Sequence, residues 1–311
     1  MYLYSTNDVG ALKMAHVGVS IVNDPDFETK VEAHKAVKAG NNKDRLARAL
    51  AELQEQESDP TIVKLGDASI ASPFTSRRTS IDAVMTVLRQ GRATLVTTVE
   101  VYKILALNCL VSAYMMSALY LEGLKQGDMQ MTVNGLMSAG LFFFLSQAKP
   151  MQRISEKRPS SSAFATAVVI SVVGQFIVHL LSLLFTLHLS KTHSKGSHHS
   201  EHVTIDGKFQ PDLINSSIYL LTTVMQVNNF VVNYRGNPFT QSIQENQLLW
   251  RSIQGIYLAI LIVAGGQLEP LNDFLQLAPF PSSEFQVYLI LILAFNFAAT
   301  WGIERFALMF E

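Results

Sequence analysis

Hydrophobic positions are concentrated in the last two-thirds of the 311-residue chain. Residues 99–311 contain six runs of 17 to 32 residues without Asp, Glu, Lys or Arg, whereas residues 1–98 contain 24 of the 49 charged side chains. About 20 helical residues cross the roughly 30 Å hydrocarbon layer of a bilayer, and a charge at the centre of such a helix costs about 2.5–3.5 kcal/mol on insertion. The runs therefore predict six membrane-spanning helices, at about residues 99–121, 129–148, 163–189, 212–233, 249–268 and 285–304.

The N-terminal region follows a different pattern. Residues 6–22 predict a short helix followed by a buried strand that ends at Val22, and residues 24–60, with 6 basic and 9 acidic side chains, predict a flexible charged insertion. From Ser80 apolar residues recur at helical spacing without a proline, which predicts one continuous helix from Ser80 to Leu121. We therefore expect a mainly α membrane protein with a small cytosolic α/β domain in residues 1–78, and a helical stalk and a six-helix transmembrane bundle in residues 79–311.

Composition and charge exclude some classes of protein and indicate how the chain is oriented in the membrane. The formal net charge of −1 leaves no basic stripe, which argues against a nucleic-acid partner, and the single cysteine, Cys109, excludes an internal disulfide. An even number of spans places both termini on one side of the membrane, and a charged N-terminal region without a signal sequence is expected to stay in the cytosol. The loops on that side would carry seven basic residues and the opposite loops four, which agrees with this orientation.

Several short segments carry a resemblance to a known family. Residues 6–13 read TNDVGALK, and this segment resembles the second half of the GDGxNDxxALK hinge motif of P-type ATPases. Residues 68–76 resemble the end of the phosphorylation domain in the type V branch, which implies that residues 1–78 are a remnant of that domain. Residues 149–159 and 237–246 are similar to cytosolic loops of its type V-A members, the endoplasmic-reticulum enzymes. The resemblance implies the C-terminal membrane half of an ATPase that uses ATP and Mg²⁺ to dislocate mis-inserted transmembrane segments. It also implies that Asn7 and Asp8 lie near the phosphoryl group and the metal, and that the lipid bilayer and client transmembrane segments are the partners.

The chain departs from that family's pattern at its catalytic motifs. It has no DKTG sequence with the phosphorylated aspartate and no TGE segment, and Leu3, Tyr4 and Ser5 stand where the family has GDG. Tyr4 would replace a Mg²⁺-binding aspartate with a poor ligand for a hard cation. We therefore expect the chain alone to be catalytically inactive, as a fragment or truncated product would be.

Polar residues within the predicted spans offer two readings. Asn108 and Asn134 lie in the first two spans, where they either line a substrate path or form hydrogen bonds between helices. No series of Asp or Glu residues interrupts the six apolar runs. This predicts that the bundle buries no carboxylate cluster of the kind that binds a transported cation. Six more polar residues are expected to serve helix packing: Gln175, His179, Gln226, Asn228, Asn229 and Asn296.

A histidine-rich loop follows the third predicted span. Imidazole is a common zinc ligand, so these histidines are a weak metal-site candidate: His193, His198, His199 and His202. Two alternatives to the ATPase reading therefore stay open. One is a non-catalytic membrane scaffold or a dominant-negative product, and the other is a cation or metal transporter that uses the histidine-rich loop.

Overall fold

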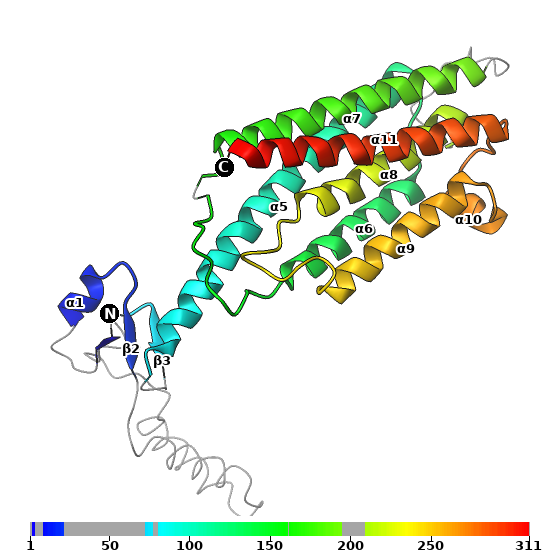
Figure 1. The fold of residues 1–311 in the computed structure, drawn as a ribbon. Helices are drawn as coiled ribbons and strands as arrows, with labels where there is room; N and C mark the ends of the chain where they lie inside the picture. The colour runs from blue at the N-terminus through cyan, green and yellow to red at the C-terminus, as the bar shows by residue number, and fades with distance from the viewer. Residues whose placement is uncertain are drawn as a thin grey trace, which may run out of the picture. The chain divides into compact units, whose positions relative to one another are not determined.

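The computed structural model describes residues 2–3, 9–21, 72–76, 80–160, 162–194 and 209–310 (Figure 1). The chain divides into two compact units, residues 1–88 and 89–311. The charged insertion predicted at residues 24–60 lies outside the described residues.

The N-terminal unit contains a small parallel sheet of three strands, β1 (Tyr2–Leu3), β2 (Val19–Ile21) and β3 (Phe74–Ser76), in the order β1-β2-β3. Helix α1 (Val9–Met14) lies close to the residue that precedes β2. A Cβ added at Gly18 would lie only 2.9 Å from the carbonyl oxygen of Leu12 in α1. The hydroxyl of Ser72 accepts the N–H of Ser20 at 3.1 Å and donates to the carbonyl of Gly18 at 2.8 Å. The predicted short helix and following strand are thus confirmed by α1 and β2.

The second unit is built from long helices that run roughly alongside one another (Figure 1). α5 (Asp82–Leu121) is continuous over 40 residues, as the apolar spacing predicts. Side-chain caps begin three of the other helices, where Asp212, Asn246 and Ser282 accept backbone N–H groups of the first turn. The helices are α5 (Asp82–Leu121), α6 (Asp128–Ser146), α7 (Thr166–His193), α8 (Leu213–Asn233), α9 (Gln247–Ala264), the short α10 (Glu269–Phe274) and α11 (Ser283–Ala307), followed by the 3-10 turn η2 (Leu308–Phe310).

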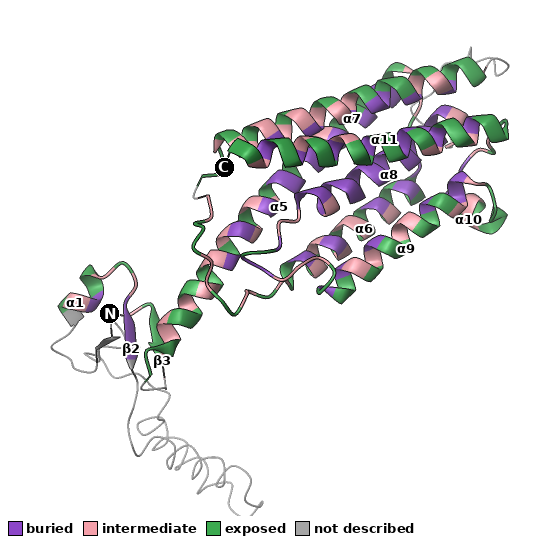
Figure 2. Ribbon diagram, in the orientation of Figure 1, coloured by how far each residue is buried: buried purple, intermediate pink, exposed green. Residues whose placement is uncertain are grey.

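Helix α8 is enclosed by the rest of the bundle (Figure 2). Nearly all of its residues are buried, whereas α7 and α11 bury one side and expose large apolar side chains such as Leu181 and Phe295 on the other. α7 and α11 approach closely at Gly174, where an added Cβ would lie 2.6 Å from Cγ2 of Ile303. The core of the bundle therefore forms around α8.

All six segments predicted to span the membrane are helical, but only part of the six-span prediction is confirmed. Among the described residues, four helical segments are long and apolar enough to cross a membrane: Asp82–Leu121, Thr166–His193, Gln247–Ala264 and Ser283–Phe310. α6 and α8 do not meet this criterion, because both contain several uncharged polar residues. A search for charge-free runs does not distinguish such a helix from an apolar one.

Candidate functional site in the helix bundle

Two acidic residues and one lysine are buried at the end of the bundle where α11 terminates. Glu100 and Lys103 are three residues apart on α5, and they share its inward face with the buried residues Ile104 and Leu107. Glu304 lies in the last turn of α11. The exposed fractions of these three charged residues are 3%, 8% and 8% in chain order, so burial in this bundle has removed all three from water.

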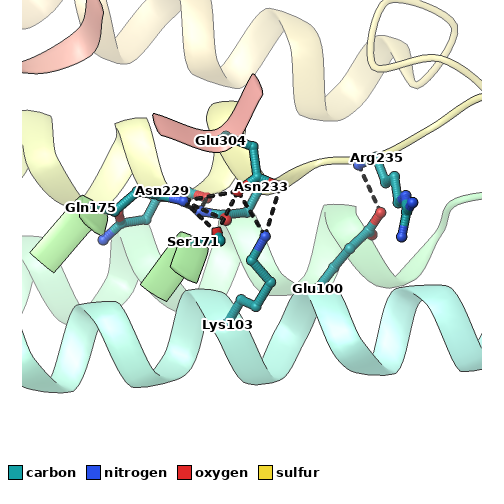
Figure 3. Close-up of polar contacts among 8 residues, drawn as sticks. All are labelled: Glu100, Lys103, Ser171, Gln175, Asn229, Asn233, Arg235 and Glu304. Atoms are coloured by element: carbon teal, nitrogen blue, oxygen red, sulfur yellow. Dashed lines mark hydrogen bonds and ion pairs between the residues drawn. The ribbon is translucent and has the colours of Figure 1, made fainter. Parts of the chain in front are cut away.

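Lys103 and Glu304 form a bidentate ion pair (Figure 3). Lys103 Nζ lies 2.7 Å from Oε1 and 2.8 Å from Oε2 of the carboxylate. Two neutral donors from α7 complete the surroundings of Oε2: the hydroxyl of Ser171 and the side-chain amide of Gln175, the latter at 3.0 Å. Buried charges are tolerated when they are paired and their remaining acceptor sites are filled, and this carboxylate meets both conditions.

Gln175 links the ion pair to α8. Its amide nitrogen donates to Oδ1 of Asn233 at 3.0 Å, and its oxygen accepts from Nδ2 of Asn233, also at 3.0 Å. The same Nδ2 donates to the carbonyl of Asn229 one turn earlier. Side chains from α5, α7, α8 and α11 therefore belong to one hydrogen-bonded network, which we call the charged network (Figure 3).

Glu100 connects α5 to the segment that follows α8. Its Oε1 accepts the backbone N–H of Arg235 at 2.7 Å, while Oε2 has no hydrogen-bond partner among the described residues. Burial lowers the pKa of the Arg235 guanidinium, and the charges of Glu100 and Glu304 oppose that shift. Two carboxylates and two cationic side chains thus meet at this end of the bundle, and their formal charges cancel.

The neighbouring Tyr234 is also removed from water. Burial and the nearby charge of Glu100 raise the pKa of its phenol to about 12. The hydroxyl donates to the carbonyl of Gln241 at 2.8 Å. Tyr234 therefore remains neutral at physiological pH and holds the loop between α8 and α9 in place.

A second polar group lies deeper in the bundle and is made of uncharged side chains. Asn229 donates to Oδ1 of Asn108 at 2.8 Å, and Nε2 of His179 lies 2.9 Å from Oδ1 of Asn229. Asn296 lies 3.2 Å from the other ring nitrogen of His179 and accepts from Asn228 at 3.0 Å. Every residue of this group is buried, so α8 carries polar contacts to α5, α7 and α11 through the centre of the bundle.

Asn134 lies apart from both groups. It is buried on α6 and accepts the hydroxyl of Thr223 on α8 at 3.1 Å. Asn108 and Asn134 each form a hydrogen bond with a side chain of α8, Asn108 with Asn229 and Asn134 with Thr223. Both form the interhelical bonds considered above, and their part in a substrate path stays a prediction.

The other predicted site residues are only partly described. Asn7 and Asp8 lie outside the described residues, as do His198, His199 and His202. His193 ends α7 with its ring packed against that of Phe285, at a centroid distance of 5.3 Å. Among the described parts of the chain, no group of three His, Cys, Asp or Glu side chains is arranged to hold a metal ion. The part of Asn7 and Asp8 in binding a phosphoryl group and Mg²⁺ therefore stays a prediction.

The prediction that no carboxylate cluster for a cation is buried in the bundle did not account for Glu100 and Glu304, which are both buried beside Lys103. A charge-free run ends, by definition, at the charged residues that border it. The predicted site residues therefore did not include Glu100, Lys103 or Glu304. A usable signal was present in the sequence. Glu100 and Lys103 stand at helical spacing from Ile104, Leu107 and Val111, and a charge aligned with an apolar stripe indicates a buried charge in need of a partner.

Comparison with known proteins places this bundle in a family. No family model matches the chain. The "Probable manganese-transporting ATPase PDR2" of Arabidopsis thaliana is 37% identical over 317 residues, covering 89% of this chain and 26% of the relative. The "Endoplasmic reticulum transmembrane helix translocase" of Saccharomyces cerevisiae is 38% identical over 252 residues, covering 81% of this chain and 20% of the relative. The "Endoplasmic reticulum transmembrane helix translocase spfA" of Aspergillus fumigatus is 38% identical over 270 residues, covering 87% of this chain and 20% of the relative.

The chain belongs to the type V P-type ATPases. It corresponds to a C-terminal part of these proteins and spans about a fifth to a quarter of the length of the relatives above. It is a multi-pass membrane protein. The charged network and the enclosed α8 are therefore features of the membrane region of a P-type ATPase.

Proposed function

We propose that the chain is the C-terminal membrane part of an endoplasmic-reticulum P-type ATPase whose complete form uses ATP and Mg²⁺ to dislocate mis-inserted transmembrane segments. In this proposal α5, α6, α7, α8, α9 and α11 all cross the membrane, with both chain termini in the cytosol. α6 and α8 cross it inside the bundle, where neighbouring helices satisfy their polar side chains. The chain alone, without the DKTG sequence, supplies membrane helices and no phosphoryl transfer.

One observation carries the choice of a helical substrate over an ion. A hard divalent cation takes six or more oxygen ligands, several of them commonly carboxylate oxygens. In the described charged network Glu304 is already bonded by Lys103, Ser171 and Gln175, and one oxygen of Glu100 accepts the N–H of Arg235. Only Oε2 of Glu100 is left without a hydrogen-bond partner there, which is too few for a cation site.

The charged network then has a structural task in the transport cycle. Lys103 supplies the positive charge that a transported cation would otherwise supply, so the network holds α5 against α7, α8 and α11 without a bound ion. Asn108 on α5 and Asn134 on α6 offer amide groups that a client's polar backbone or side chains could bond during its passage. Both residues remain proposals as path-lining groups.

The test uses the complete enzyme that carries this chain, reconstituted in vesicles. ATP hydrolysis is measured with an apolar transmembrane peptide or with Mn²⁺ added to a Mg²⁺-containing buffer. The proposal expects stimulation by the peptide and none by Mn²⁺. Stimulation by Mn²⁺ alone would support cation transport, and the absence of any ATP hydrolysis would support a non-catalytic scaffold.

The path residues are tested in the same assay. Asn134→Leu removes an amide that contacts α8, and we expect peptide-stimulated turnover to fall about fivefold, as for the loss of about 1 kcal/mol of hydrogen bonding. The matched control is Leu181→Ala, since Leu181 is 60% exposed on the outer face of α7. If the two substitutions lower peptide-stimulated turnover equally, the proposal that Asn134 lines the substrate path is wrong.

A further inference from the structure

An apolar groove runs between α5 and α7, next to the charged network. Its cavity volume is about 440 Å³. Small and β-branched residues form most of its walls, with Val169 and Val173 about half exposed. Both helices are long and apolar enough to cross a membrane, so this surface faces hydrocarbon. A groove of this kind in a membrane helix pair suits an acyl chain.

Exposed aromatic residues indicate that one end of the groove lies at the membrane–water interface. Tyr102 is 58% exposed and Phe164 is 88% exposed, and both line the groove. Tyrosine is enriched at the level of the lipid headgroups because its ring is apolar and its hydroxyl is polar. Phe164 lies two residues before the start of α7, so this end of the groove adjoins the loop between α6 and α7.

That loop is basic and is tied to α5. Residues 147–165 contain four basic side chains and one acidic one. Arg92 on α5 donates to the carbonyls of Ser155 at 2.6 Å and Lys157 at 3.0 Å, which fixes the loop beside the helix. Val99, the first groove residue of α5, follows Arg92 by seven positions, or about 10 Å along the helix. Lys157 and Arg158 are both exposed and lie on the loop that Arg92 holds beside α5, five to six positions before the groove residue Ala163.

We propose that this groove binds an acyl chain of an anionic glycerophospholipid, whose phosphate is held by Lys157 and Arg158. Lys103 also lines the groove, but its ammonium is paired with Glu304, so the loop supplies the attraction for the headgroup. Each basic residue near an anionic lipid strengthens binding by about fivefold. The proposal concerns a lipid site and does not depend on the substrate of the complete enzyme.

The chain contains a matched control groove. A second cavity of about 470 Å³ lies between α7 and α11 and is lined by apolar and aromatic residues such as Phe185, Leu291 and Phe295. Among the described residues that line it there is no Lys or Arg. An acyl chain can enter either groove, but only the groove between α5 and α7 should distinguish one headgroup from another.

The experiment uses the full 311-residue chain in phosphatidylcholine nanodiscs with a trace of photoactivatable lipid. The probe carries a diazirine in its acyl chain and either a phosphatidylserine or a phosphatidylcholine headgroup, and mass spectrometry locates the crosslinks. We expect at least a fivefold preference for phosphatidylserine in the groove between α5 and α7. The groove between α7 and α11 should label equally with both probes.

Three variants decide the outcome. Lys157→Gln with Arg158→Gln should remove the preference without lowering phosphatidylcholine labelling, whereas Lys157→Arg with Arg158→Lys should retain it. Val169→Trp should fill the groove and abolish labelling there, while the control groove still labels and thereby reports an intact bundle. Equal labelling by the two probes, a preference that survives the double Gln substitution, or crosslinks to a second copy of the chain would overturn the proposal.

Discussion

The buried ion pair between Lys103 and Glu304 should be the most sensitive polar contact in the bundle. Replacing one member of a buried pair leaves the other charge uncompensated, at a cost of about 3–5 kcal/mol. Replacing both members with apolar residues of similar size is often neutral or stabilising, because the desolvation cost of both charges disappears. We therefore expect the two single variants to be destabilised strongly and the double variant to recover most of the loss.

The two single variants should differ from each other. In Lys103→Met the carboxylate of Glu304 keeps the donors Ser171 and Gln175, so the loss should lie near 3 kcal/mol. In Glu304→Leu the ammonium of Lys103 loses both of its recorded hydrogen bonds in a site that is 8% exposed, so the loss should approach 5 kcal/mol. The order of the two losses follows from the contacts and does not depend on their absolute size.

A double-mutant cycle measures this coupling. The free energy of unfolding of the chain is obtained by SDS titration in mixed micelles for the wild type, both single variants and the double variant. The ion pair Lys191–Glu122 is the control, because its side chains are 46% and 23% exposed, and Glu122→Gln should cost at most about 1 kcal/mol. Additive losses at Lys103 and Glu304, with a coupling below about 0.5 kcal/mol, would refute the reasoning.

The remaining predictions concern packing, topology and the long helix. Gly174→Ala should destabilise the chain by about 1–3 kcal/mol through overpacking against Ile303, and Ile303→Ala should relieve much of that loss in the same SDS titration. Cysteines placed at Ser155 and Gln267 in a background without the native cysteine should label from opposite sides of the membrane, and labelling from one side would contradict the proposed crossing of the intervening helices. Gly91→Ala should stabilise α5 by up to about 1 kcal/mol, because Gly91 lies inside the helix with open space around its Cα, and a decrease in thermal stability would contradict this assignment.

The positions of the helices could be predicted from the sequence because the signals for them are local. Long runs without charge, the absence of proline between Ser80 and Leu121, and capping residues such as Asp212 and Ser282 all act within a few residues of the structure they specify. The segment TNDVGALK placed a short helix before a strand, and α1 and β2 occupy those positions. The same residues carried the resemblance to P-type ATPases.

The candidate site could not be predicted in the same way, because its members come from four helices. Lys103 and Glu304 are 201 positions apart, and Gln175 and Asn233 are 58 apart, so no local pattern reveals that they meet. The sequence could show that Glu100 and Lys103 share a helix face with apolar residues. It could not show whether this face meets water, lipid or a partner.

By itself the sequence determined which segments are helical, that several of them suit a membrane, and which protein family they resemble, since composition and short-range periodicity carry that information. Only the tertiary structure decided that α8, which is polar but uncharged, is enclosed by the other helices, and that Lys103 neutralises Glu304 inside the bundle. The physical reason is that burial depends on which helices pack together. A polar helix is stable at the centre of a membrane protein only when its neighbours supply hydrogen-bond partners, and those neighbours are distant in sequence.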